Sequence, residues 1–383
     1  MNQVALELDT TEATGVDRTG FDIGWDHAHH GLVPPPQLLL PGTPVCQGWM
    51  AGRAVFGRRT LASSRQVRQW LALRLQAWRQ GTPFETLSVT PNFLAQIHGT
   101  HCPVRRVPLG GAEGEADAAV VVRLNSSAHY AAGNLVQMSH AAAQARQGVS
   151  ATEAVRHARQ CELTGDSFNG LTAAQWWRVA TLAGFATPLP FPESARLPLA
   201  VLPPNRVRLL NAAQGLQALV TELFASDGWS TRCRDLAQLL PAHTLRHDFN
   251  LFVGAMAPRV LEAGAAGSNR RLALEDAWLQ ERVQRRWQHL VLSLGEAATE
   301  ALLERAARLA LPGRRVLNHP AAQAVEGWGM PAAPGDTSPL LSRRLSPAGA
   351  TQGPARRAGR PAAVAAPQAP VTRASAVRPA AAR

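Results

Sequence analysis

Apolar residues recur at helical spacing through most of this chain, and this periodicity limits the folds that are open to it more than any other feature. The first clear run covers residues 63–79, where Val67, Trp70, Leu71 and Trp78 fall on one helix face. Residues three and four positions apart share a face, so helices of this kind must pack against one another to bury it. The sequence therefore predicts a mainly α fold.

Helix starts are marked by a recurring pattern, the capping box, in which Ser or Thr caps the first turn and Glu or Gln three residues later bonds back. Three pairs fit it: Ser63 with Gln66, Ser150 with Glu153, and Thr172 with Gln175. Further helical runs cover residues 205–225, 231–240, 244–263, 271–293 and 296–309. We expect Pro203 and Pro204 to open the first of these runs, because proline is tolerated at a helix start.

The chain divides into five predicted regions. Residues 1–60 are rich in Gly, Pro and His without a clear period, and predict irregular structure that packs on a later domain through Phe21, Trp25, Trp49 and Phe56. The other four are an amphipathic helix and linker at 61–97, a small insert at 98–148, a helical bundle at 149–330, and an Arg/Ala/Pro-rich tail at 331–383. The tail has too few apolar residues to build a core and is predicted to be disordered.

The basic residues are all arginine, because the chain contains no lysine, and this excludes a Schiff-base lysine and a P-loop lysine. The formal net charge is +12, of which +7 belongs to residues 331–383 and +5 to residues 1–330. An excess of arginine favours anionic partners. We expect nucleic acid as the partner, DNA rather than RNA, and no membrane; the sequence does not identify a protein partner.

Cysteine usage and the apolar runs indicate a cytoplasmic protein. The four cysteines, Cys46, Cys102, Cys161 and Cys233, are scattered and form no CxxC motif, which favours reduced thiols. The first residues are acidic rather than positively charged, so we expect no signal peptide. No apolar stretch approaches the roughly 18 residues of a membrane span.

The insert at 98–148 combines a knuckle, a strand, a loop, a second strand and a short helix. These pieces are Cys102–Arg105, Val121–Asn125, Tyr130–Leu135 and Ser139–Arg146. The run Val122–Asn134 resembles the segment that joins the two strands in the HNH (ββα-metal, treble-clef-like) endonuclease family, in the form found in phage and mobile-element proteins of proteobacteria. The resemblance covers residues 98–147 and implies a small ββα module.

The resemblance also implies where catalytic groups would lie. In the family a His on the first strand activates water, an Asn orients it, and an acid and a helix imidazole or amide hold a divalent cation. Here the orienting position is Asn134, and the helix ligand would fall near Ala143, with His140 the only imidazole nearby. The base position is Arg123, which stays protonated, and the acid position is Val122. The resemblance therefore implies a catalytically degenerate module.

A structural zinc site is not favoured at the knuckle. A four-ligand site of this kind needs a second cysteine, and Arg105 stands at its position. The remaining candidates for metal ligands are His98, His101 and Cys102, which would require a distant fourth partner.

The leading hypothesis is nucleic-acid binding without catalysis, and the predicted contacts are Arg105, Arg123 and Arg146 in the module and Arg65 and Arg68 on the first helix. One alternative is a divergent endonuclease that would need Mg²⁺ or Mn²⁺; otherwise no cofactor is expected. The other alternative is a helical scaffold or adaptor without a nucleic-acid role, which binds protein through its bundle and uses the tail as a solvent-exposed arm. In that case Arg65 and Arg68 belong to a solvated helix face. The missing active-site groups favour a protein that is not an enzyme.

Overall fold

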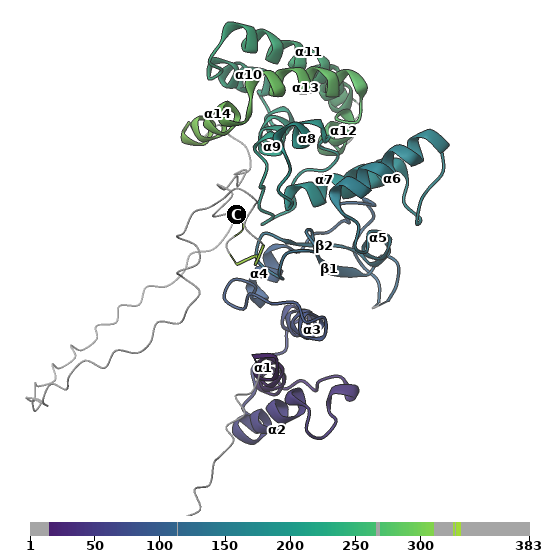
Figure 1. Ribbon diagram of the computed structural model, residues 1–383, viewed down its shortest axis with the longest axis vertical. Coiled ribbons are helices and arrows are strands. Elements are labelled where there is room, and N and C mark those ends of the chain that lie inside the picture. The colour runs from purple at the N-terminus through teal and green to yellow at the C-terminus, as the bar shows by residue number, and fades with distance from the viewer. Residues whose placement is uncertain (1–14, 113, 266–268, 310–324, 326, 331–383) are drawn as a thin grey trace, which may run out of the picture. The chain divides into compact units, whose positions relative to one another are not determined.

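The computed structural model describes residues 15–112, 114–265, 269–309, 325 and 327–330 (Figure 1). Within these residues the chain forms fourteen α-helices, one short 3₁₀-helix and one two-stranded antiparallel sheet. The predicted mainly α fold is confirmed. In the same part of the chain no helix is long and apolar enough to cross a membrane. The predicted disordered tail, residues 331–383, lies outside the described residues.

The N-terminal region is helical, so the prediction of irregular structure over residues 1–60 is wrong for its described part. Helix α1 spans Gly15–His29, a 3₁₀-helix η1 spans Pro36–Leu38, and α2 spans Pro44–Phe56. Thr43 starts α2, because its side chain accepts a hydrogen bond from the Cys46 N–H and proline follows at the first helical position. In the described part of this region, irregular structure is confined to the connection between α1 and α2, outside η1, and to residues 57–60 after α2.

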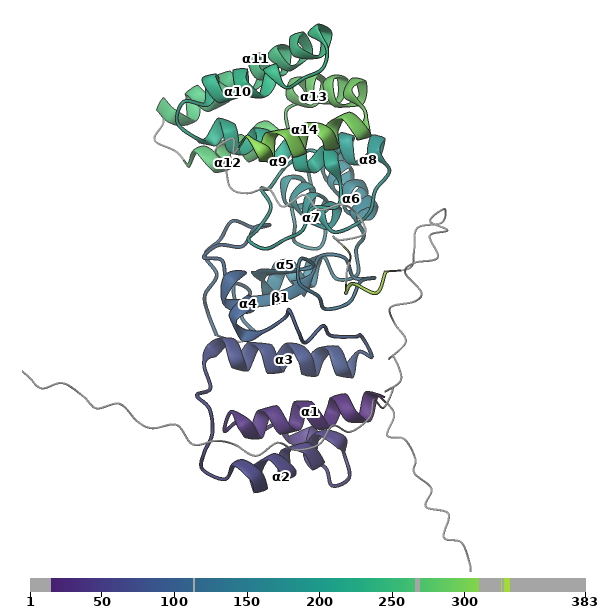
Figure 2. The same ribbon diagram turned by 90° about the vertical axis from the view of Figure 1, so that its left-hand side faces the viewer.

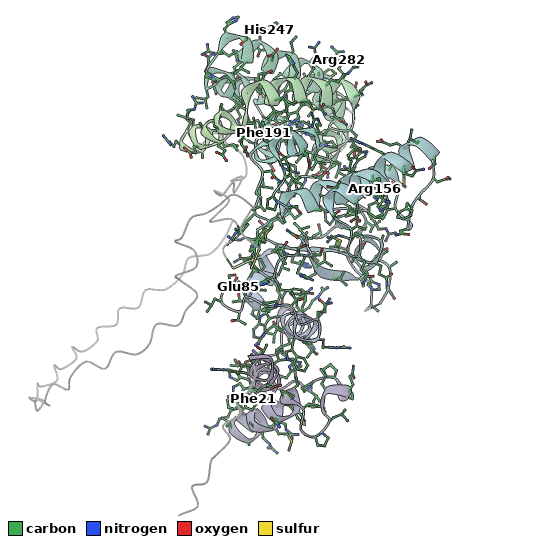
Figure 3. All side chains as sticks on the ribbon, viewed as in Figure 1. Phe21, Glu85, Arg156, Phe191, His247 and Arg282 are labelled. Carbon is green, nitrogen blue, oxygen red and sulfur yellow. The ribbon has the colours of Figure 1, made fainter. Side chains whose placement is uncertain are left out.

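Glycine spacing explains how α1 and α2 pack. A Cβ at Gly24 would collide with the backbone oxygen of Val45, and a Cβ at Gly48 would collide with that of Phe21. Glycines therefore let the two backbones approach one another directly. The aromatic residues of this region accordingly pack within the α1–α2 pair, as Trp25 does against the edge of Phe56 (ring centroids 5.1 Å apart), with Phe21 labelled in Figure 3.

Helix α3 (Arg65–Arg79) packs on α1, which lies between α2 and α3 (Figure 2). The buried guanidinium of Arg74 pairs with Asp26 of α1 and lies over the Trp70 ring at 4.5 Å. The N-cap is Ser64 rather than the predicted Ser63, since the Ser64 hydroxyl accepts from the Val67 N–H at 3.2 Å. Helix α4 (Pro91–Gln96) then leads into the insert.

The insert has the predicted order of strand, strand and helix, with shifted strands. Strand β1 spans Ala119–Arg123, β2 spans Leu135–Ser139, and α5 spans His140–Ala145. The strands pair antiparallel, with Ala119 opposite Ser139 and Arg123 opposite Leu135. The predicted strands Val121–Asn125 and Tyr130–Leu135 extend into the connecting loop, because residues 124–134 fold on themselves instead of continuing the ladder.

The C-terminal half is helical, as predicted. Its helices are α6 (Ala151–Thr164), α7 (Ala173–Phe185), α8 (Phe191–Arg196), α9 (Ala212–Ala225), α10 (Trp229–Gln238), α11 (His243–Ala265), α12 (Arg270–Ala277), α13 (Glu281–Leu294) and α14 (Glu296–Arg308). The capping boxes of Ser150 with Glu153 and of Thr172 with Gln175 are both present.

Two predicted boundaries in this half are wrong. Residues 203–211 are not helical, and α9 begins only after Asn211, whose side chain bonds to the backbone of α7 instead. The predicted helix at 271–293 divides into α12 and α13, and at the break Trp278 turns into the core and donates to the Thr221 hydroxyl at 2.8 Å. One apolar core runs from the insert into this half, and its largest fully buried residues include Trp176, Trp278, Trp287, Phe185 and Phe224.

We expect Gly48→Ala to lower the free energy of unfolding by about 1–3 kcal/mol, because the added methyl group forces α1 and α2 apart. The matched control is Gly254→Ala in α11, where a Cβ meets no atom within 4 Å and should stabilise the helix by about 0.5–1 kcal/mol. Urea unfolding followed by circular dichroism measures both. Equal effects of the two substitutions would contradict the close α1–α2 contact.

Stability should fall in mild acid because of His27. Burial lowers the pKa of this histidine below its ordinary value of 6.5. The unfolded chain therefore takes up a proton at pH values where the folded chain does not, and the free energy of unfolding drops as the pH falls below about 6.5. Urea unfolding between pH 7 and pH 5 should show a shallower loss for His27→Gln than for the native chain, and an unchanged loss for the exposed control His243→Gln.

Candidate nucleic-acid interface

Asn134, predicted at the orienting position, lies at the centre of the β1–β2 loop with no exposed surface. Its amide nitrogen donates to the backbone oxygens of Asn125 and His129, both at 3.0 Å, and its amide oxygen accepts from the Asn125 N–H at 2.8 Å. These three bonds satisfy the amide inside the loop, and its arrangement is that of a residue that closes a turn.

Arg123, predicted at the base position, also turns toward this loop. Its Nη1 donates to the backbone oxygens of Ser126 and Ala128, both at 2.7 Å. The guanidinium lies over the Tyr130 ring at 4.6 Å. The pKa of the neighbouring His129 is lowered, mainly because the ring is partly buried and also because the positive charge of Arg123 is close. Arg123 thus holds the loop against the end of β1.

Arg146 is an interior residue. Its side chain leaves the end of α5 and donates to the backbone oxygens of Arg123 at 2.8 Å and Leu124 at 2.9 Å. Burial first and the charge of Arg123 second lower the pKa of this guanidinium from 12.5 to about 10. We therefore remove Arg146 from the predicted interface, because a buried guanidinium that is occupied by backbone oxygens cannot meet a phosphate.

His140 lies at the opposite end of the hairpin from Asn134. Its backbone N–H donates to the oxygen of Ala118, just before β1 begins, whereas Arg123 ends that strand. Five residues of extended strand span about 16 Å. The structure therefore brings Arg123 and Asn134 to one loop and does not bring His140 to them.

A distant segment covers the same loop. Residues 327–330 pack on it, and Trp328 is fully buried there. The Trp328 indole donates to the oxygen of Ala132 at 3.0 Å, and the Trp328 backbone oxygen accepts from the His129 N–H at 2.9 Å. Sequence reasoning assigned residues up to 330 to the helical bundle and missed this contact, because no local pattern links Trp328 to residues almost 200 positions earlier.

The knuckle residues do not gather around a common point. Cys102 is buried, and its sulfur accepts from the Arg105 N–H at 3.4 Å and the Ser139 hydroxyl at 3.3 Å. His98 and His101 are exposed, and His101 contacts the Thr100 hydroxyl at 3.0 Å. Across the described ranges, no group of three His, Cys, Asp or Glu side chains is placed to hold a metal ion.

Beside the knuckle is a cavity of about 540 Å³, lined by His98, His101, Arg106, Asn205, Arg271, Glu275 and neighbouring residues. Glu275 is almost fully buried and pairs with Arg106 and Arg271, each at 3.1 Å. Arg106 also pairs with Asp276 at 2.8 Å. These ion pairs join the knuckle to α12, so the arginines of this cavity are already neutralised. Arg105 is neutralised in the same way by Asp117 at 2.7 Å.

One group of exposed arginines without acidic partners lies on α2, in the first turn of α3 and in the loop between these helices. We call this set the basic surface, and it consists of Arg53, Arg58, Arg59, Arg65 and Arg68. All five are exposed, and none forms an ion pair within the part of the chain that the structure describes. Residues 27–84 contain no Asp or Glu at all, and the sequence alone could have pointed to this region. The predicted contacts Arg65 and Arg68 belong to this surface.

Comparison of the chain with protein-family models, curated proteins and solved structures found no significant match.

Asn134→Ala should lower the free energy of unfolding by about 2–3 kcal/mol, because it leaves the buried N–H of Asn125 without an acceptor. Thermal and urea unfolding measure the change. The control is Asn92→Ala at an exposed position on α4, which should change stability by less than about 0.5 kcal/mol. A stable Asn134→Ala variant would show that the loop does not depend on this amide.

Proposed function

We propose that this protein binds the phosphate backbone of nucleic acid, duplex DNA foremost, through the basic surface and without catalysis. The observation that carries the proposal is the set of five exposed arginines without ion pairs among the described residues, with Arg79 a sixth at the other end of α3, in a stretch of 58 residues that has no acidic side chain. Surface arginines are ordinarily interspersed with acids, as they are on α12 and α13 of this chain.

The chemistry of the basic surface suits phosphate. A guanidinium presents donors in a planar fork that matches two phosphate oxygens. Arg65 and Arg68 lie in the first turn of α3, where free backbone N–H groups and the helix dipole also favour an anion, and this turn contains no acid that would repel one. Arg58 and Arg59 precede that turn in the chain and extend the same positive field.

In this proposal the HNH-like ββα segment supports the fold instead of cutting nucleic acid. The interior positions of Asn134 and Arg146 support that reading. The divergent endonuclease remains the second candidate, since it follows from the family resemblance, and it makes a different prediction: added Mg²⁺ or Mn²⁺ would convert supercoiled plasmid to nicked circles.

The test compares two double variants of the full chain. Arg65→Ala with Arg68→Ala removes two charges from the basic surface, and Arg282→Ala with Arg286→Ala removes two from the exposed side of α13 (Figure 3 labels Arg282). Fluorescence anisotropy with a labelled DNA duplex gives the affinity at several salt concentrations. Each lost phosphate contact should lower the slope of log affinity against log salt by about 0.9. We expect a fall of about two in the first variant and little change in the second.

The tail carries eight arginines and contributes equally to all variants, so it cancels in this comparison. Equal slopes for the two double variants would refute the basic surface as the binding site. Absence of any duplex binding at low salt would leave the helical scaffold as the remaining hypothesis. A duplex RNA of the same length, run in parallel, tests the preference for DNA.

A further inference from the structure

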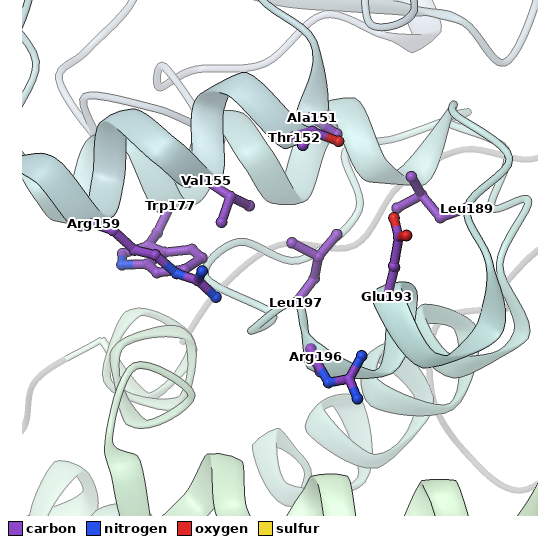
Figure 4. Close-up of a pocket in the computed structure, with 9 residues that line it drawn as sticks. All are labelled: Ala151, Thr152, Val155, Arg159, Trp177, Leu189, Glu193, Arg196 and Leu197. Atoms are coloured by element: carbon purple, nitrogen blue, oxygen red, sulfur yellow. The ribbon is translucent and has the colours of Figure 1, made fainter.

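A second, smaller cavity lies between α6, α7 and α8, away from the basic surface and from the insert's loop (Figure 4). It has a volume of about 240 Å³. Its apolar lining consists of Ala151, Val155, Trp177, Leu189 and Leu197, and its polar lining consists of Thr152, Arg159, Glu193 and Arg196. An apolar cavity with few polar groups at its edge is the usual form of a small-molecule site.

The cavity is held open by hydrogen bonds behind its lining. The indole of Trp177 donates to the Glu162 carboxylate at 2.6 Å, which fixes the ring. The Leu197 backbone oxygen accepts from the Gln217 side chain at 2.8 Å. The Leu189 N–H donates to the Asn211 side chain at 3.0 Å. A ligand would therefore meet a largely preformed surface and would not have to order it.

The two arginines at the edge of the cavity form no ion pair that would stabilise the fold. Arg159 on α6 and Arg196 on α8 are both exposed, and neither forms an ion pair within the described segments. Figure 4 shows these two side chains on either side of Leu197, with Glu193 beside Leu189. An anionic group bound over Leu197 would lie between two guanidinium groups, while Glu193 would repel a second negative charge near Leu189.

We propose that this cavity binds a small monocarboxylic acid with an aromatic or branched aliphatic body. The body would pack on Val155, Trp177 and Leu189, and the carboxylate would bind Arg159 and Arg196. Because the cavity is smaller than the roughly 300–1,000 Å³ typical of drug-sized ligands, the acid must be small. The proposal does not depend on nucleic-acid binding, since no residue is shared with the basic surface.

The first experiment measures the binding of 3-phenylpropionate and 4-methylvalerate to the full chain by isothermal titration calorimetry, with 3-phenylpropionamide as the uncharged counterpart. We expect at least one acid to bind and the amide to bind at least about tenfold more weakly, because it cannot accept charge-assisted hydrogen bonds. No binding of either acid, or equal binding of 3-phenylpropionate and its amide, overturns the proposal.

The second experiment locates the site with three variants. Arg159→Gln should weaken acid binding at least about fivefold and leave amide binding unchanged. Val155→Phe should abolish both by filling the cavity, and its circular dichroism spectrum reports whether it folds. The control is Arg156→Gln, an exposed arginine on the same helix that does not line the cavity (Figure 3). Equal effects of the Arg159 and Arg156 substitutions would place the acid elsewhere and refute the proposal.

Discussion

The β1–β2 loop is closed by two buried polar side chains, and the centre of the structure depends on the hydrogen bonds that they make. Asn134 bonds within the loop, and Arg146 bonds from the end of α5 to the backbone oxygens of Arg123, the last residue of β1, and Leu124, which follows it. Unsatisfied oxygens and N–H groups in this position would each cost about 1–3 kcal/mol. The loop in turn sets the register of the strands, positions Leu124 in the main core, and provides the surface on which Trp328 packs.

The absence of lysine gives arginine two separate roles. Inward arginines bond to backbone oxygens or to acids that are buried or half-buried, as Arg74, Arg106, Arg146 and Arg178 do. Five donors on a weakly hydrated plane make guanidinium the cation best suited to such burial. Outward arginines on α2 and α3 have no such partners. The net charge of the described residues therefore does not show where an anion would bind, because part of the positive charge belongs to arginines that are bonded inside the fold.

Sequence periodicity predicted the helices well, because a helical face and a capping box are local features. Ser150 and Thr172 start helices for the reasons their neighbours indicated. It failed at α1 and α2, where glycines resemble helix breakers until their close packing is known, and at residues 203–211, where Asn211 is held by α7. In the insert the motif gave the order of elements, but it could not show that Arg146 turns inward or that Trp328 covers the loop, since both depend on contacts distant in sequence. The sequence alone shows the acid-free stretch, whereas only the structure shows that its arginines are exposed.

We propose that phosphate contact belongs to the α2–α3 region and that the β1–β2 loop has a structural role. Hydrogen–deuterium exchange of the full chain with and without a DNA duplex tests it most directly. We expect new protection in the peptides that cover residues 53–68, and no change in those that cover residues 123–134, because the polar groups of that loop are bonded within the fold. Protection that appears at 123–140 and leaves 53–68 unchanged would contradict it.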